Sequence, residues 1–236
     1  MSLLIRRGFI LFCLVAAAIF ARLGFWQVGR LEQRRAANRK AMAARTAPPV
    51  VLEPNRARPD SLTDRRLIAA GSYDPDHEMV LRGSAVLGVP GVALVTPLRL
   101  RNTDTAVLVY RGFVPAPDAM TVEADALREP GEVQVEGVAQ PAQAGGGAPL
   151  EHGGRTTWAR VDLDAMRSRI PYPVLPVVLR QSPAPGQVSF PRRQPPPALD
   201  DGPHLGYAVQ WFLFGGFALG FAWLVGRRPT PHRSAP

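Results

Sequence analysis

Two long apolar runs lie near the ends of the 236-residue chain. The first, GFILFCLVAAAIFARLGFWQVG, covers residues 8–29 and carries one charge, Arg22. The second, LGYAVQWFLFGGFALGFAWLVG, covers residues 205–226 and carries none. As a helix, each run is long enough to cross a hydrocarbon layer roughly 30 Å thick. The pattern predicts transmembrane helices over 8–29 and 204–226, with residues 30–203 on one side of the membrane and both termini on the other.

A cleaved secretory signal peptide is the alternative interpretation of the first run. Arg6 and Arg7 precede it, and the alanines at 16–18 offer a cleavage site. The apolar run continues beyond those alanines, which favours an uncleaved anchor. Arg22 lies in the last third of the run, where its long side chain can extend to the interface, and Trp26 follows at the depth of an aromatic belt.

Arginines beside the two runs give conflicting indications of orientation. The tails, residues 1–7 and 227–236, carry Arg6, Arg7, Arg227, Arg228 and Arg233. The stretch after the first run carries Arg30, Arg34, Arg35, Arg39, Lys40 and Arg45. On a simple count, the positive-inside rule would place the middle segment in the cytoplasm. The rule is less secure beside a long translocated domain, so the charge pattern alone leaves the orientation open.

The segment between the two runs changes its pattern at about residue 46. Residues 30–45, RLEQRRAANRKAMAAR, are rich in helix formers and predict an extension of the first helix, which TAPPV then ends. Further on, short β-branched or alternating runs are separated by Gly, Pro, Asn and Asp. These runs are RLIAAGSY, HEMVLRG, VALVTPLRL, AVLVYRGFV, EVQVEGVAQ, TTWARVDL and VLPVVLRQ.

The predicted fold is therefore a membrane protein in which two transmembrane α-helices flank a mainly β, α+β extramembrane domain. We expect that domain to span residues 30–182 and to be a barrel or a sandwich. A short helix begins near Asp162 or Asp164 and ends at Pro171. Residues 142–155 read as a glycine-rich loop without the features of a phosphate loop, and residues 183–203 as a Pro-rich tether.

Composition narrows the range of partners. The net charge is +9, almost all of the positive charge is arginine, and the arginines are scattered. Scattered arginines without an aromatic-and-basic RNA-binding signature do not favour nucleic acid as a partner, so we expect the lipid bilayer instead. The single cysteine, Cys13, lies inside an apolar run. One cysteine excludes an intrachain disulfide framework and any Cys-x-x-Cys zinc, redox or haem-attachment motif.

Residues typical of catalysis are sparse between the two apolar runs. That segment contains two histidines, His77 and His152, and no Gly-x-Ser-x-Gly nucleophile motif. Asp74, Asp76, His77 and Glu78 could suggest a metal site, but neighbouring residues of a strand point to opposite faces, so a solvated turn is favoured. We expect no catalytic residues and no enzymatic activity.

Three stretches together resemble the Surfeit-locus (Surf-type) family of cytochrome c oxidase assembly factors. LGFWQVGR (23–30) is similar to the LGxWQxxR signature of that family, and HLGYAVQWF (204–212) matches its HxxYAxQW motif. LVYRGFVP (108–115) is similar to its central VNRGWVP strand, although Tyr110 and Phe113 replace the Asn and Trp of the motif. This departure leaves the roles of Tyr110 and Phe113 open. The resemblance covers most of residues 22–226.

The resemblance implies several properties. It implies a protein of the cell (inner) membrane, with both termini cytoplasmic and the β-rich domain on the periplasmic face. It implies association with cytochrome c oxidase subunit I and its assembly intermediates. Some members of the family are taken to bind haem a, which makes His204 the candidate ligand of the haem iron.

The start of the second apolar run supports a hypothesis about this site. On a helical projection, His204, Tyr207 and Trp211 fall on one stripe about 80° wide. The stripe continues with Gly215, Ala218 and Ala222. Small residues let another helix, or a flat macrocycle, approach closely. Arg22 and Trp26 could face this stripe, with Arg22 pairing a haem propionate. The alternative is that Tyr207 and Trp211 are interface anchors and His204 contacts lipid headgroups.

Three functions remain in competition at this point. The first is an assembly factor that helps haem a reach, or stay in, oxidase subunit I. The second is a membrane-anchored scaffold that binds oxidase intermediates without haem. The third is an unrelated enzyme with its site in the β domain.

Overall fold

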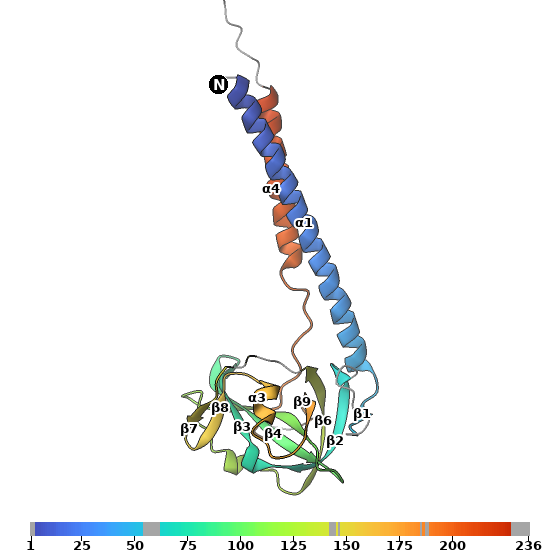
Figure 1. Ribbon diagram of the computed structural model, residues 1–236, viewed down its shortest axis with the longest axis vertical. Coiled ribbons are helices and arrows are strands. Elements are labelled where there is room, and N and C mark those ends of the chain that lie inside the picture. Colours follow the sequence, from blue (N-terminus) through green and yellow to red (C-terminus); the bar gives the residue numbers. More distant parts are fainter. Residues whose placement is uncertain are drawn as a thin grey trace, which may run out of the picture. The chain divides into compact units, whose positions relative to one another are not determined.

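The computed structural model describes residues 3–53, 62–141, 145, 147–184, 186 and 189–227 (Figure 1). The chain forms two compact units, one made of residues 1–40 with 199–236 and the other of residues 41–198. Parts of the expected tails, residues 1–2 and 228–236 with Arg228 and Arg233, lie outside the described residues. The predicted order of a helix, a mainly β domain and a second helix is confirmed.

Helix α1 (Leu3–Thr46) as far as Lys40 and helix α4 (His204–Arg227) form the first unit, together with the chain that leads into α4. Both are long and apolar enough to cross a membrane. Helix α1 runs through residues 30–45 without a break, because this stretch consists mainly of helix-forming residues. It also begins at Leu3, so the part of the expected N-terminal tail from Leu3 onward is helical.

Helices α1 and α4 pack along a seam with coiled-coil spacing. On α4 the least exposed side chains recur at intervals of four and three residues: His204, Ala208, Trp211, Gly215, Ala218 and Ala222. On α1 the same spacing gives Cys13, Ala17, Phe20, Gly24, Gln27 and Leu31. This spacing averages 3.5 residues, the repeat that keeps two helices in contact along their length.

Close contacts along the seam explain its small residues. A Cβ atom on Gly24 would lie 2.6 Å from Cε1 of Phe212, so a larger residue there would displace that ring. Phe20 stacks on Trp211, with ring centroids 5.8 Å apart. Arg6 donates a hydrogen bond to the carbonyl of Gly226 at the other end of the pair, which shows that the helices run antiparallel.

A closed barrel forms the centre of the second unit. Its strands are β2 (Arg66–Tyr73), β4 (Val89–Leu100), β5 (Ala106–Pro115), β6 (Glu132–Pro141) and β9 (Val174–Gln181). They follow the order β2-β6-β9-β5-β4, and pairing of Gly71 with Leu100 closes the ring between β2 and β4. The structure thus selects a barrel over a sandwich.

The strand directions define the type of barrel. Strands β5 and β9 run parallel, and every other neighbouring pair in the ring is antiparallel. A five-stranded Greek-key ring is the architecture of OB-type barrels, a scaffold on which many unrelated functions occur. Leu67, Leu98, Val107 and Leu179 are among the side chains that fill its interior.

Additional elements extend the sheet on both sides of the barrel. Strand β3 (Met79–Val86) joins β4 to β8 (Arg155–Trp158), and β7 (Leu150–His152) and β1 (Val50–Val51) form its edges among the described residues. The prediction of one loop over 142–155 is therefore wrong in its second half, where β7 and the start of β8 pair. Gly153 and Gly154 adopt positive φ angles in the turn between them.

Short helices connect several of the strands, among them η2 (Pro75–His77), η3 (Ala124–Leu127) and α3 (Leu163–Arg167). Asp162 caps α3 by accepting a hydrogen bond from the backbone N–H of Ala165, as predicted. The helix ends at Arg167, before Pro171. Together with Trp158, α3 covers a second apolar core on the outer face of the sheet.

Candidate functional site

The first and last of the three family-like segments meet in the helix pair. Nδ1 of His204, the first residue of α4, lies 2.9 Å from Oε1 of Gln27, which belongs to LGFWQVGR on α1. The seam brings these residues together because Gln27 occupies a position of α1 that faces α4. The two segments are therefore parts of one local structure.

This hydrogen bond selects one form of the imidazole. The amide oxygen of Gln27 is an acceptor, so Nδ1 of His204 carries the donated proton. In the neutral ring, Nε2 then keeps its lone pair. A second-shell hydrogen bond that fixes the tautomer and the ring orientation is the usual arrangement of a metal-binding histidine. The geometry leaves His204 able to bind a metal through Nε2.

A cleft of about 320 Å³ lies beside His204. It is lined by Arg30, Gln33, Arg34, Asp200, Gly202 and His204. Arg30, the last residue of LGFWQVGR, donates a hydrogen bond to Gln33 at 3.2 Å. Arg34 contacts the backbone carbonyl of Asp200 at 3.1 Å and its carboxylate at 3.7 Å. With two guanidinium groups and one carboxylate, the cleft has the charge to accept an acidic group.

The structure separates the other predicted site residues from this cleft. Trp211 lies in the helix seam, where it stacks on Phe20. Tyr207 is 48% exposed and does not face α1. Ala208 occupies the buried position that was expected for Tyr207. A seam with a repeat of 3.5 residues follows position 208, whereas position 207 falls just outside it.

The expectation that Arg22 and Trp26 face α4 is wrong. Both side chains are exposed, whereas Phe20, Gly24 and Gln27 are among the positions of α1 that contact α4. Arg22 is two residues from Phe20 and from Gly24, which places it about 200° around the helix from each. Arg30 lines the cleft beside His204, and Arg22 does not.

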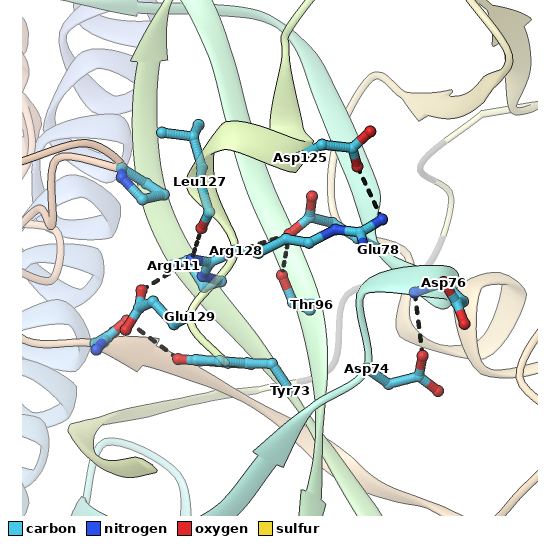
Figure 2. A network of polar contacts seen from close by, with 12 residues as sticks. Tyr73, Asp74, Asp76, Glu78, Thr96, Arg111, Asp125, Leu127, Arg128 and Glu129 are labelled. Carbon is cyan, nitrogen blue, oxygen red and sulfur yellow. Dashed lines mark hydrogen bonds and ion pairs between the residues drawn. The ribbon is translucent and has the colours of Figure 1, made fainter. Parts of the chain in front are cut away.

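The barrel unit contains a second candidate, a buried ionic cluster that sequence reasoning missed (Figure 2). Arg111, in the central family-like segment, has a side chain only 2% exposed. It donates hydrogen bonds to Glu78 at 2.9 Å and to Glu129 at 2.8 Å. Thr96 donates to Glu78 at 2.6 Å, and Arg193 donates to Glu129 at 2.7 Å. A charged residue inside the otherwise apolar run AVLVYRGFV was the available signal.

Tyr73 forms one wall of this cluster. The guanidinium carbon of Arg111 lies 4.8 Å from the centre of its ring, a cation–π distance. Burial is the main reason that the pKa of the Tyr73 hydroxyl is well above its usual value, so the phenol stays neutral. The cluster thus consists of two arginines and two glutamates against a neutral aromatic ring.

The acidic segment around His77 forms a turn, as the sequence favoured. Residues 75–77 form η2, a 3-10 turn, so Nδ1 of His77 lies 2.9 Å from Asp74. The hydroxyl of Tyr172 donates to the same carboxylate. Burial alone would raise the pKa of Asp74, but the hydrogen bonds from Tyr172 and His77 outweigh it and lower that pKa. Within the described ranges no three His, Cys, Asp or Glu residues are grouped to hold a metal ion.

A cavity of about 1080 Å³ lies beside the ionic cluster. Residues of η2, η3 and the β7–β8 turn line it, among them Glu78, Asp125 and Arg155. Arg155 and Arg128 both pair with Asp125 at 2.9 Å. The lining carries carboxylates such as Glu78 and Asp125 as well as arginines such as Arg128 and Arg155, so the cavity is not of a single charge.

Comparisons with known proteins identify relatives across nearly the whole chain. The model of the SURF1 family matches residues 14–216. A SURF1-like protein of Monosiga brevicollis is 29% identical over 224 residues, covering 90% of this chain and 85% of that protein. A SURF1-like protein of Rickettsia felis is 31% identical over 102 residues, covering 42% of this chain and 43% of that protein. The family match includes both segments that meet at His204.

Proposed function

The chain belongs to the SURF1 family, and from this premise we propose that it is a membrane-anchored assembly factor for haem-copper cytochrome c oxidase. It would act on subunit I and its assembly intermediates as a carrier or chaperone, without turnover of its own. The contact between Gln27 and His204 is the observation that carries the proposal. It joins two family-like segments around an imidazole that is free to bind a metal.

The cargo that suits this site is haem a, to be delivered to or retained in subunit I. His204 would bind the haem iron through Nε2, and Gln27 would hold the imidazole ring in place. Arg30 and Arg34 would face the propionate carboxylates from the same cleft. Exposed Tyr207, one turn beyond His204, can pack against the edge of the macrocycle. Trp211 is left out of this contact because it stacks on Phe20.

The localisation that fits this role is the cell (inner) membrane, with both termini cytoplasmic and the barrel unit periplasmic. The positive-inside rule applies best to short segments, and long translocated domains follow it weakly. The short tails, with Arg6, Arg7 and Arg227, therefore count for more than the arginines that precede the barrel. A reporter fused to either end should be active only on the cytoplasmic side. A periplasmic signal from the C-terminal fusion would overturn this orientation.

Purification of the full chain from a host that makes haem a tests the cargo. We expect an absorption spectrum of bound haem a that His204→Ala abolishes and that His152→Ala, a control in the β domain, leaves unchanged. Gln27→Ala should weaken haem binding by about 10–100-fold, as loss of a second-shell partner does. Arg30→Gln should weaken it while leaving the iron ligand in place. Wild-type protein that carries no haem, or an unchanged spectrum in His204→Ala, would refute haem carriage.

The second candidate is a scaffold that binds oxidase intermediates without haem. One observation favours it: helix α1 covers the stripe of α4 that could have received a macrocycle, and Trp211 is used in that packing. A scaffold would still be isolated with subunit I when His204→Ala is substituted and haem is absent. If deletion of the gene leaves oxidase level and haem a content normal, both candidates fail.

A further inference from the structure

The Pro-rich tether of residues 183–203, which precedes α4, is hydrogen-bonded to the barrel near the middle of the tether. The backbone N–H of Phe113 donates to the carbonyl of Arg192 at 2.9 Å, and the N–H of Arg192 donates to the carbonyl of Phe113 at 2.7 Å. This reciprocal pair is an isolated antiparallel bridge on strand β5. The sequence predicted a Pro-rich tether over 183–203, and at this point the tether pairs with a strand of the barrel.

Gly112 makes this approach possible. A Cβ atom at position 112 would lie 2.4 Å from the carbonyl oxygen of Arg192, well inside van der Waals contact. Its φ angle of +139° is also one that residues with a side chain rarely adopt. The glycine of the family-like segment LVYRGFVP is therefore required where the tether crosses the strand.

Arg193 adds a partly buried ion pair to the backbone bridge. Its side chain is 5% exposed and donates to Oε1 of Glu129 at 2.7 Å. The same oxygen accepts a hydrogen bond from Arg111 at 2.8 Å. A single carboxylate thus joins a strand residue to a tether residue. Removing the charge of Glu129 would leave the buried guanidinium groups of Arg111 and Arg193 without this carboxylate, which is strongly unfavourable.

A second contact lies further along the tether. Arg45, in the last turn of α1, donates to the carbonyl of Pro197 at 2.8 Å and to the carboxylate of Asp64 at 2.7 Å. These three residues belong to the unit of residues 41–198. The tether is therefore held at two points before it leaves that unit.

We propose that Arg111, Gly112 and Glu129 are positioning residues that hold the tether and so keep the barrel on a short connection to α4. From the end of β9 to His204, the 22 residues 182–203 could reach about 75 Å when extended. Beyond Pro197, the six residues 198–203 reach only about 20 Å. This proposal goes beyond the proposed function and holds whether or not haem binds.

Limited digestion of the full chain in detergent with trypsin tests the proposal, since trypsin cleaves after arginine. In the wild type, cleavage after Arg192 requires the bridge to open. In Arg193→Gln the site after Arg192 remains, and its cleavage rate should rise about tenfold or more, because proteolysis follows the population of the open state. Glu129→Gln should raise it further. Arg66→Gln removes an exposed ion pair of the barrel and should change nothing.

A second readout separates tether release from general unfolding. Amide hydrogen exchange should accelerate at Phe113 and Arg192 in Arg193→Gln, while amides of the barrel interior such as Leu98 and Val107 stay protected. Glu129→Asp, which restores the charge, should recover part of the protection from trypsin. Cleavage of Arg193→Gln at the wild-type rate would overturn the proposal. So would cleavage of the wild type after Arg192 as fast as that of a free peptide of the same sequence.

Discussion

Arg111→Leu should destabilise the barrel unit far more than an arginine substitution on its surface. The arginine side chain is 2% exposed and contacts the carboxylates of Glu78 and Glu129, the carbonyl of Leu127 and the ring of Tyr73. Leucine would fill part of the volume but would satisfy neither carboxylate. Glu78, whose side chain is 4% exposed, would keep Thr96 at 2.6 Å and a distant Arg155 at 3.9 Å.

The size of the effect follows from the burial of the pair. Removing one partner of a buried ion pair typically costs about 3–5 kcal/mol, because the remaining charge stays buried. For a domain of this size, about 2–4 °C of Tm is lost per kcal/mol, so Tm should fall by roughly 6–20 °C. The control Arg66→Leu breaks the pair with Glu136, whose side chain is 43% exposed. Exposed pairs contribute about 0–1 kcal/mol, so the control should lose at most about 4 °C.

Thermal unfolding of the full chain in detergent, followed by circular dichroism, measures both variants. Adding Glu78→Gln to Arg111→Leu should recover part of the loss, because the amide removes one buried charge. A Tm within about 4 °C of the wild type for Arg111→Leu would show that the cluster is not coupled to stability as its burial implies. Strict additivity of the two substitutions would refute the charge argument itself.

Three further predictions test other parts of the structure. Ala218→Cys should form a disulfide with the native Cys13 under mild oxidation, because both positions lie on the α1–α4 seam. Leu219→Cys, at a position that is 50% exposed, should not form it, and the crosslinked band on a non-reducing gel distinguishes the two variants. Asp74 has a lowered pKa in the folded state, so its contribution to stability is present above the unfolded-state pKa and is lost as pH falls below about 4. The decrease of Tm in acid should therefore be smaller in Asp74→Asn than in the wild type, whereas the control Asp164→Asn, at an exposed position, should show the same decrease as the wild type. Leu87→Asn should raise Tm by about 1–4 °C, because Leu87 has a φ angle of +52° in the two-residue β3–β4 turn and Asn tolerates this conformation better. The leucine side chain is 92% exposed, so little packing is lost, and an unchanged or lower Tm would contradict the strain argument.

Local sequence patterns predicted most of the helices and strands of the fold. The runs RLIAAGSY and VLPVVLRQ coincide with β2 and β9 residue for residue, because short apolar runs bounded by turn-forming residues are a recognisable strand signal. Strands β1 and β7 have two and three residues, too few to show alternation, and both were missed. The choice between barrel and sandwich depends on β2 pairing with β4 as well as with β6, a long-range contact that no local pattern encodes.

The candidate site was predictable in part. The stripe on α4 correctly placed His204 and Trp211, because helical periodicity alone defines which residues share a face. It could not identify Gln27 as the partner of His204, since that contact depends on how α1 packs. Arg111 was missed for a related reason. Its partners Glu78 and Glu129 lie 33 and 18 residues away, and only the closed barrel brings them together.

The family-like segments share one structural role in this chain, although they lie in different units. Gln27 meets His204 across 177 residues, and Gly112 with Phe113 receives the tether around Arg192. In both places, the residue types of the segment are required because another part of the chain approaches it closely. Substitutions in the two regions should therefore impair assembly by different routes. Changes around Gln27 alter the imidazole of His204, whereas changes around Gly112 alter the length of chain that connects the barrel to the membrane helix.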